Sequence, residues 1–181
     1  MECTACHEAD LKPSYLEGLI PCHTCPSCGG NLLMLTDYLR WLEQNDNPDF
    51  VQTNASSVEA EDTEMALLCP KTGSIMTKYR IATDSDHRLD YSPRINAVWM
   101  DAGEWELIKE KGLAGQLNQV FTDHWQKDLV SRESAEILGT MYQRKFGEHY
   151  DQIKEFRALL DVMEERHEVI AYLMADDPYR A

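Results

Sequence analysis

The chain has 181 residues and a formal net charge of −15, from 17 basic and 32 acidic side chains. This acidity repels a phosphate backbone at long range, which weighs against a general nucleic-acid-binding protein. The sequence contains no apolar run of about 18 residues, as a membrane span requires, and its first residues do not resemble a signal peptide. We therefore expect a cytoplasmic protein whose six cysteines are reduced and available as metal ligands.

Two pairs of cysteines near the start of the chain carry most of the chemical information. Cys3 and Cys6 form one Cys-x-x-Cys pair, and Cys25 and Cys28 form another. Two such pairs at this separation have the spacing of a structural zinc site, in which four thiolates surround the metal as a tetrahedron. The sequence therefore predicts one structural Zn2+ bound by Cys3, Cys6, Cys25 and Cys28.

The residues around the second pair leave an alternative choice of ligands. Cys22, Cys25 and Cys28 form two overlapping Cys-x-x-Cys pairs. The Pro-Ser-Cys-Gly-Gly context favours Cys25 and Cys28, so Cys22 and His23 are expected near the metal but outside its ligand shell. The extra cysteines also suit an iron–sulfur cluster, which is the alternative to zinc. The two glycines that follow Cys28 are expected to give the backbone positive φ beside the sulfurs.

The first part of the chain, residues 1–44, is predicted to be a zinc ribbon of short β-strands followed by a short helix. The helix is expected to begin at Thr36 or Asp37, because either side chain can cap its first turn. The composition then becomes polar and acidic, with few side chains suited to burial. Residues 45–64 are therefore predicted to be an acidic flexible linker.

A second β-rich module is predicted at residues 65–112. It contains Cys69-Pro-Lys-Thr72-Gly, and later Ser92-Pro-Arg-Ile95 followed by Asn-Ala-Val-Trp-Met-Asp-Ala-Gly-Glu. This second stretch closely matches the pattern Cys-Pro-x-Cys-Gly-Gly-Val-Trp-Leu-Asp-x-Gly-Glu. On these residues the chain resembles the transcription-factor-IIB-type zinc-ribbon family of bacterial proteins, once in residues 1–35 and again in residues 65–112.

The resemblance implies that Cys69, Thr72, Ser92 and Ile95 occupy the four ligand positions of the second module. Three of these residues are not metal ligands, so the module is predicted to be a degenerate ribbon without metal. Packing around large side chains such as Trp99 is expected to replace the cross-link that a metal provides. Cys69 itself is expected to be a small buried apolar residue rather than a nucleophile.

The remaining residues, 113–181, are predicted to be helical. A broken apolar stripe precedes Gly147, and after it apolar residues recur at alternating spacings of three and four from Ile153 to Met174. This seam predicts one helix over residues 151–175 with the seam buried. Gly147 offers a turn, so an antiparallel helical hairpin is expected, with a dimeric coiled coil as the alternative. The predicted fold class is thus α+β, with two small ribbons followed by a C-terminal helical hairpin.

No catalytic motif accompanies these elements, since the sequence lacks the nucleophile elbow, the P-loop and the zinc-protease signature. A four-cysteine zinc site is also closed to substrate. We therefore expect a non-enzymatic zinc-ribbon protein that acts as a protein-interaction or regulatory module. The alternatives are a transcription-related, nucleic-acid-associated factor and an enzyme with an unrecognised site. Weak nucleic-acid contact would use a local basic cluster consisting of Lys78, Arg80, Arg88 and Arg94.

Overall fold

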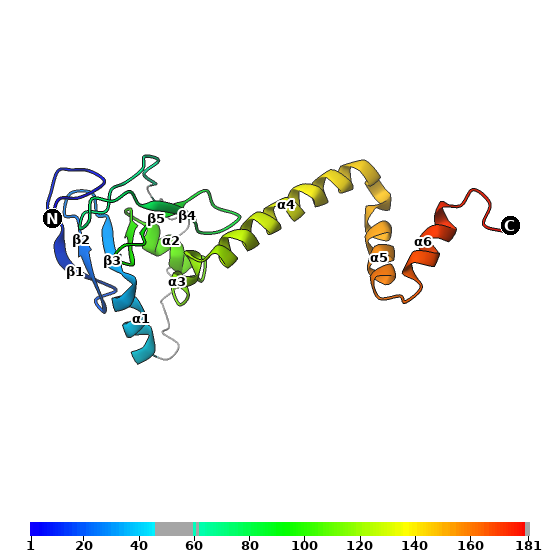
Figure 1. The fold of residues 1–181 in the computed structure, drawn as a ribbon. Coiled ribbons are helices and arrows are strands. Elements are labelled where there is room, and N and C mark those ends of the chain that lie inside the picture. Colours follow the sequence, from blue (N-terminus) through cyan, green and yellow to red (C-terminus); the bar gives the residue numbers. More distant parts are fainter. Residues whose placement is uncertain (46–59, 61, 180–181) are drawn as a thin grey trace. The chain divides into compact units, whose positions relative to one another are not determined.

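The computed structural model describes residues 1–45, 60 and 62–179. It divides the chain into two compact units, Met1–Arg132 and Glu133–Ala181. The first unit holds all of the described strands, so the predicted α+β class is confirmed (Figure 1). The strands are β1 (Lys12–Leu16), β2 (Ile20–Thr24), β3 (Asn31–Met34), β4 (Thr77–Arg80), β5 (Arg88–Ser92) and β6 (Ala97–Met100), and the helices of this unit are α1 (Leu35–Gln44), α2 (Glu104–Glu110), α3 (Leu117–Val120) and the first part of α4 (Asp123–Phe146).

The two predicted ribbon stretches meet in one sheet. Its six strands are all antiparallel to their neighbours and follow the order β1-β2-β3-β6-β5-β4. Each stretch supplies three consecutive strands, and the two halves join edge to edge where β3 pairs with β6. From either edge towards the centre, the sheet contains the first, second and third strand of one stretch. Two copies of a three-stranded unit related by an approximate two-fold axis would produce this order.

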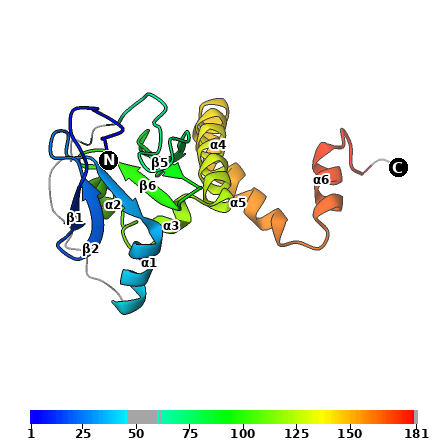
Figure 2. The ribbon, with the colours of Figure 1, turned by 60° about the vertical axis from the view of Figure 1, so that its left-hand side comes forward.

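The side chains of the two central strands, β3 and β6, alternate between two apolar cores on opposite faces of the sheet. Leu33 lies opposite Val98, and both belong to a helix-side core with Tyr38 and Trp105 from α1 and α2. Figure 2 shows α1 following directly on β3. Leu32 lies opposite Trp99, and both belong to a cysteine-side core on the other face. Successive side chains of a strand point to opposite faces, so β3 and β6 contribute to both cores at once. The cysteine-side core consists of Cys3, Leu11, Cys25, Leu32, Leu67, Cys69, Met76, Ala97 and Trp99.

The short helix after the first ribbon is confirmed, but it begins earlier than the capping residues suggest. Helix α1 starts at Leu35, and Met34 precedes it without a side-chain cap. The backbone N–H of Leu35 instead donates to the carbonyl oxygen of Asn96 at 2.8 Å. The neighbouring turn between β5 and β6 thus satisfies the first N–H of a helix that begins before Thr36 and Asp37.

Most of the predicted acidic linker, residues 45–64, lies outside the described residues. The described end of this stretch is attached to the sheet. The backbone N–H of Thr63 donates to Asp101 Oδ2 at 2.7 Å, and Lys78 Nζ lies 3.9 Å from Asp62. Residues 62 and 63 therefore belong to the folded second module.

The second unit is helical, as predicted, but the prediction of a single helix over residues 151–175 is wrong. Helix α4 ends at Phe146, a 3-10 turn (Gly147–His149) follows, and the rest divides into α5 (Tyr150–Asp161) and α6 (Arg166–Met174). At the break, the N–H groups of Val162 and Met163 donate to carbonyls three residues back, at 3.3 Å each. Asp161 and Val162 are both poor helix formers, and the Asp161 carboxylate instead pairs with Arg166 at 3.0 Å.

The predicted turn at Gly147 is present, with a φ of 56°, but the apolar residues on both sides of it stay exposed. Ile137 and Met141 on α4 and Ile153 and Phe156 on α5 are each more than one third exposed. The chain therefore does not form a packed hairpin with a buried seam in this structure. No helix within the described residues combines the length and apolar character needed to cross a membrane.

Candidate metal centre

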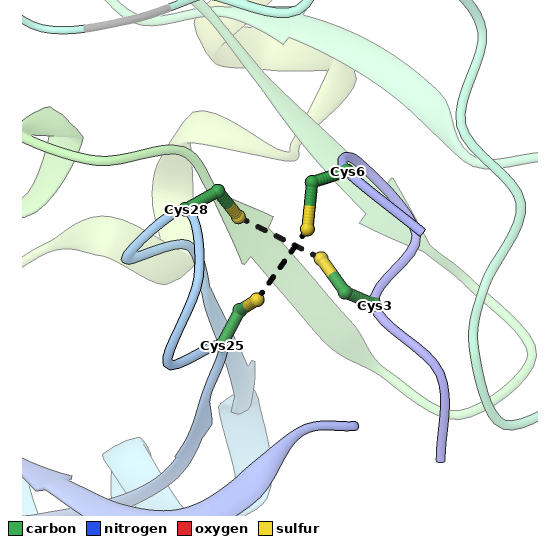
Figure 3. A group of neighbouring side chains, drawn as sticks. All are labelled: Cys3, Cys6, Cys25 and Cys28. Carbon is green, nitrogen blue, oxygen red and sulfur yellow. Dashed lines mark hydrogen bonds between the residues drawn. The ribbon is translucent and has the colours of Figure 1, made fainter. Parts of the chain in front are cut away.

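Four thiols from the two predicted Cys-x-x-Cys pairs meet at one point (Figure 3). Cys3 Sγ lies 3.7 Å from Cys28 Sγ, and Cys6 Sγ lies 3.6 Å from Cys25 Sγ. All four sulfur atoms lie within 4.8 Å of one another. A tetrahedral zinc site with Zn–S bonds of about 2.3 Å requires S···S separations of about 3.8 Å. The four cysteines therefore fit one structural Zn2+, as the sequence predicts.

Backbone turns hold the sulfurs in place. In the second pair, which connects β2 to β3, the N–H of Cys25 donates to the Gly30 carbonyl at 2.8 Å. The N–H of Gly29 returns to the Cys25 carbonyl at 3.0 Å, and Gly29 has a φ of 75°. His7 follows the first pair with a φ of 56° in the corresponding place. A residue in the left-handed region directly after the second cysteine thus closes each turn.

Gly30 is required for a different reason from the positive φ expected of it. A Cβ atom at Gly30 would lie 2.3 Å from Cζ2 of Trp99. No side chain can occupy that space while the indole ring stays in place. Because Trp99 belongs to β6, this close approach couples the metal-binding turn to the second half of the sheet.

The environment of the thiols differs across the cluster. Burial raises the pKa of Cys25, but donation from the backbone N–H groups of Cys28 and Ser27 and from the thiols of Cys28 and Cys3 outweighs burial and lowers that pKa to about 7. Burial raises the pKa of Cys3 and of Cys28. Hydrogen bonds to the thiolate therefore outweigh burial at Cys25 but not at Cys3 or Cys28.

Cys22 and His23 lie in strand β2 rather than in the metal-binding turn. Cys22 is buried in the helix-side core, where burial raises the pKa of its thiol. Its strand neighbour His23 is half-buried opposite Leu32. Neither residue belongs to the group of four converging ligands.

The second module repeats the turns of the first without its ligands. The N–H of Cys69 donates to the Ser74 carbonyl at 2.8 Å, and the N–H of Gly73 returns to the Cys69 carbonyl at 2.8 Å. Gly73 follows Thr72 with a φ of 67°, as His7 follows Cys6, and Asn96 follows Ile95 with a φ of 51°, as Gly29 follows Cys28. The two modules thus share these backbone turns, while the assignment of the second module as a degenerate ribbon remains a prediction.

The residues in the predicted ligand positions of this module pack together as ordinary side chains. Cys69 is 1% exposed and Ser92 is fully buried. Burial raises the pKa of the Cys69 thiol, but the nearby hydroxyls of Ser92 and Thr72 and two backbone N–H groups outweigh it, so the net direction is downward. Within the part of the chain that the structure describes, only the four N-terminal cysteines form a group with metal-ligand geometry.

A group of buried carboxyl side chains at the end of β6 was not foreseen from the sequence. Asp101 Oδ1 accepts the indole N–H of Trp99 at 2.7 Å, and Glu104 Oε2 accepts the backbone N–H of Asp101 at 2.7 Å. Burial, and then the nearby charges of Asp101, Asp62 and Asp90, raise the pKa of Glu104 to about 9, despite the backbone N–H of Asp101. Glu104 is therefore a neutral carboxylic acid at pH 7. The Asp-x-Gly-Glu segment of the sequence carries the signal for this group, because it sets two carboxyl side chains three residues apart at the start of α2.

The four basic residues proposed for nucleic-acid contact do not share one environment. Lys78 Nζ donates to the buried Asp90 carboxylate at 2.8 Å, and Arg80 Nη2 lies 3.9 Å from Asp86. Arg88 lies opposite Arg80 in the sheet and is exposed. Arg94 is exposed in the turn between β5 and β6, at the far end of β5.

Comparison with known proteins supports the assignment of the first ribbon. Residues 2–44 match the family model described as the transcription factor zinc-finger, a zinc ribbon of the transcription-factor-IIB type. No curated protein and no solved structure matches the chain. The matched residues contain all four converging cysteines. The N-terminal segment of this chain, residues 2–44, is therefore a zinc ribbon of the transcription-factor-IIB type.

Proposed function

We propose that the chain is a non-enzymatic zinc-ribbon protein that binds another macromolecule, and that the partner is a protein. The observation that carries this proposal is the state of the second unit. Among described residues 133–179, no side chain is buried, although the helices carry many large apolar residues. Helices with exposed apolar faces are marginal in water, and packing against a partner stabilises them.

The metal centre supports a structural role for zinc rather than a catalytic one. Four thiolates complete the tetrahedron around Zn2+, so no position remains for water or substrate. Zinc binding then contributes directly to the folding of the N-terminal half of the sheet. The proposed setting is the cytoplasm, because zinc-binding thiols must stay reduced.

A role in transcription through nucleic-acid contact is the second candidate, and the match of residues 2–44 to a transcription factor zinc-finger favours it. Two basic residues in the second module, Arg88 and Arg94, are exposed. Against this candidate stand the net charge of −15 and the acidic partners of Lys78 and Arg80. A few exposed arginines on an acidic protein supply little of the electrostatic free energy that phosphate binding needs.

One pair of measurements separates the two candidates. Binding of the full-length, zinc-loaded protein to duplex DNA and to RNA is measured across a series of salt concentrations. If the partner is a protein, we expect no binding to DNA or RNA whose affinity falls steeply with salt. Phosphate contacts instead predict a steep linear fall of log K with log salt concentration. In parallel, a pull-down from native cell extract compares the wild-type chain with Phe156→Asp, which changes the exposed face of α5. Loss of captured proteins in the variant supports protein binding through the second unit. Equal capture by both chains contradicts it.

A further inference from the structure

The second unit has no buried side chain among described residues 133–179, and one face of α4 within it combines apolar and charged residues. Ile137 is 63% exposed and Met141 is 47% exposed, although both lie in the middle of a regular helical stretch of α4. A groove of about 510 Å³ runs along this part of α4, and its described lining residues are Glu136, Ile137, Thr140, Met141 and Arg144.

The lining residues form two adjacent rows. Positions four apart lie on the same helix face, so Glu136, Thr140 and Arg144 form one row, and Ile137 and Met141 form the next. The first row is acidic at its N-terminal end and basic at its C-terminal end. Glu136 and Arg144 are about 12 Å apart along the helix axis and cannot pair within one chain. Neither makes an ion pair with another of the described residues.

This arrangement is self-complementary under an antiparallel two-fold axis. The midpoint between Glu136 and Arg144 is Thr140, and the midpoint between Ile137 and Met141 is Gly139. An axis that crosses α4 at this level places Glu136 of each copy opposite Arg144 of the other, and Ile137 of each copy opposite Met141 of the other. A two-fold interface needs this reciprocity, in which residue i contacts residue j and j contacts i. The charged row and the apolar row are centred one residue apart, about 1.5 Å along the helix axis, so one axis serves both closely.

We propose that the occupant of this face is a second copy of the chain, and that the protein self-associates through antiparallel pairing of α4 around residues 139 and 140. The proposal deepens the proposed function, on which it rests, by naming the partner of the α4 face. Pairing covers Ile137 and Met141 with apolar surface and neutralises two pairs of opposite charges at the rim. The exposed faces of α5 and α6 are not used in this contact and stay open to other proteins.

The test is the oligomeric state of the full-length, zinc-loaded protein, measured by sedimentation over a wide range of concentrations. The wild-type chain is expected to show a concentration-dependent monomer–dimer equilibrium. Met141→Asp places a charge in the apolar row and is expected to abolish the dimer. Because Met141 is exposed in the monomer, circular dichroism should show an unchanged fold.

Charge reversal tests the register. Glu136→Arg or Arg144→Glu alone sets like charges opposite each other at two symmetry-related places, and each is expected to raise the dissociation constant about tenfold. The double variant Glu136→Arg/Arg144→Glu restores opposite charges at both places and is expected to recover wild-type association. Glu148→Arg, in the turn beyond α4, is the matched control and should leave association unchanged.

Three results would overturn the inference. A wild-type chain that stays monomeric at all concentrations removes the second copy as occupant. A dimer that is insensitive to Met141→Asp uses another surface. A double charge reversal as weak as the single ones excludes the antiparallel register. A monomeric chain that still captures proteins from extract in a Phe156-dependent way contradicts self-association but leaves the proposed function standing, so the two failures are distinguishable.

Discussion

Replacing Trp99 tests the view that the two halves of the sheet depend on each other. The side chain is 1% exposed, packs in the cysteine-side core and donates its indole N–H to Asp101. Truncating a buried tryptophan to alanine typically costs about 3–5 kcal/mol, and the lost hydrogen bond adds about 1 kcal/mol. We therefore expect Trp99→Ala to lower the free energy of unfolding by about 4–6 kcal/mol. Since small domains have a total stability of about 5–15 kcal/mol, the variant should be close to unfolding.

The assay is urea denaturation of the zinc-loaded protein, followed by far-UV circular dichroism. Trp125→Ala is the matched control, because Trp125 is only partly buried and lies against the edge of the helix-side core. This control is expected to lose less than about 2 kcal/mol. Trp99→Phe fills most of the same space but cannot donate to Asp101, so its loss should be about 1–3 kcal/mol.

The Trp99→Ala variant should also release zinc faster than the wild type, although Trp99 is not a ligand. Its ring covers Gly30, which belongs to the turn that holds Cys25 and Cys28. Competition with a chelator measures this effect directly. A Trp99→Ala variant as stable as Trp125→Ala, or one that retains zinc as the wild type does, would show that this residue does not link the two halves of the sheet.

Further predictions concern the metal and the buried acid. Metal analysis should find one zinc per chain. Cys25→Ser should abolish zinc retention, whereas Cys22→Ser should only weaken the helix-side core. Equal zinc loss in both variants would show that the chosen set of ligands is wrong. Gly30→Ala should destabilise the fold by several kcal/mol, because its Cβ would lie 2.3 Å from the Trp99 ring, and a near-neutral result in thermal unfolding would contradict the contact. Glu104 has a pKa of about 9 in the folded protein against 4.5 as its ordinary value. The unfolded state therefore loses this proton first, so the stability contributed by Glu104 falls as pH rises from 4.5 towards 9. Glu104→Gln stays neutral, and the fall in unfolding free energy above about pH 6, where zinc ligands remain deprotonated, should be smaller than in the wild type. An unchanged pH profile would show that Glu104 ionises normally.

The metal ligands could be predicted from the sequence because a Cys-x-x-Cys turn is a local structure. The spacing of Cys25 and Cys28 sets two sulfurs on one side of a metal whatever the rest of the chain does. The choice of Cys25 and Cys28 over Cys22 also held, because glycine after the second cysteine suits the left-handed turn. In each case a few neighbouring residues determine the geometry.

The pairing of β3 with β6 could not be predicted, because it joins segments that are distant in the sequence. Alternation indicates that Leu32 and Trp99 each face a core, but the identity of the neighbouring strand depends on tertiary packing. The break between α5 and α6 was missed for a related reason. The apolar spacing continues through Val162 and Met163, so periodicity alone does not reveal the change in backbone hydrogen bonds there.

The edge-to-edge junction of β3 and β6 has a consequence for how the chain responds to its metal supply. Zinc anchors the turn between β2 and β3, and β3 is in turn the only lateral support of β6 on that side. The described residues of the second half form no group of metal ligands, so this half depends on the first half through the four residue pairs that join β3 to β6. Metal loss should appear in hydrogen exchange as joint opening of both halves, in one cooperative unit that extends well beyond the thiols. Binding of a single ion should therefore determine whether both halves of the sheet stay ordered.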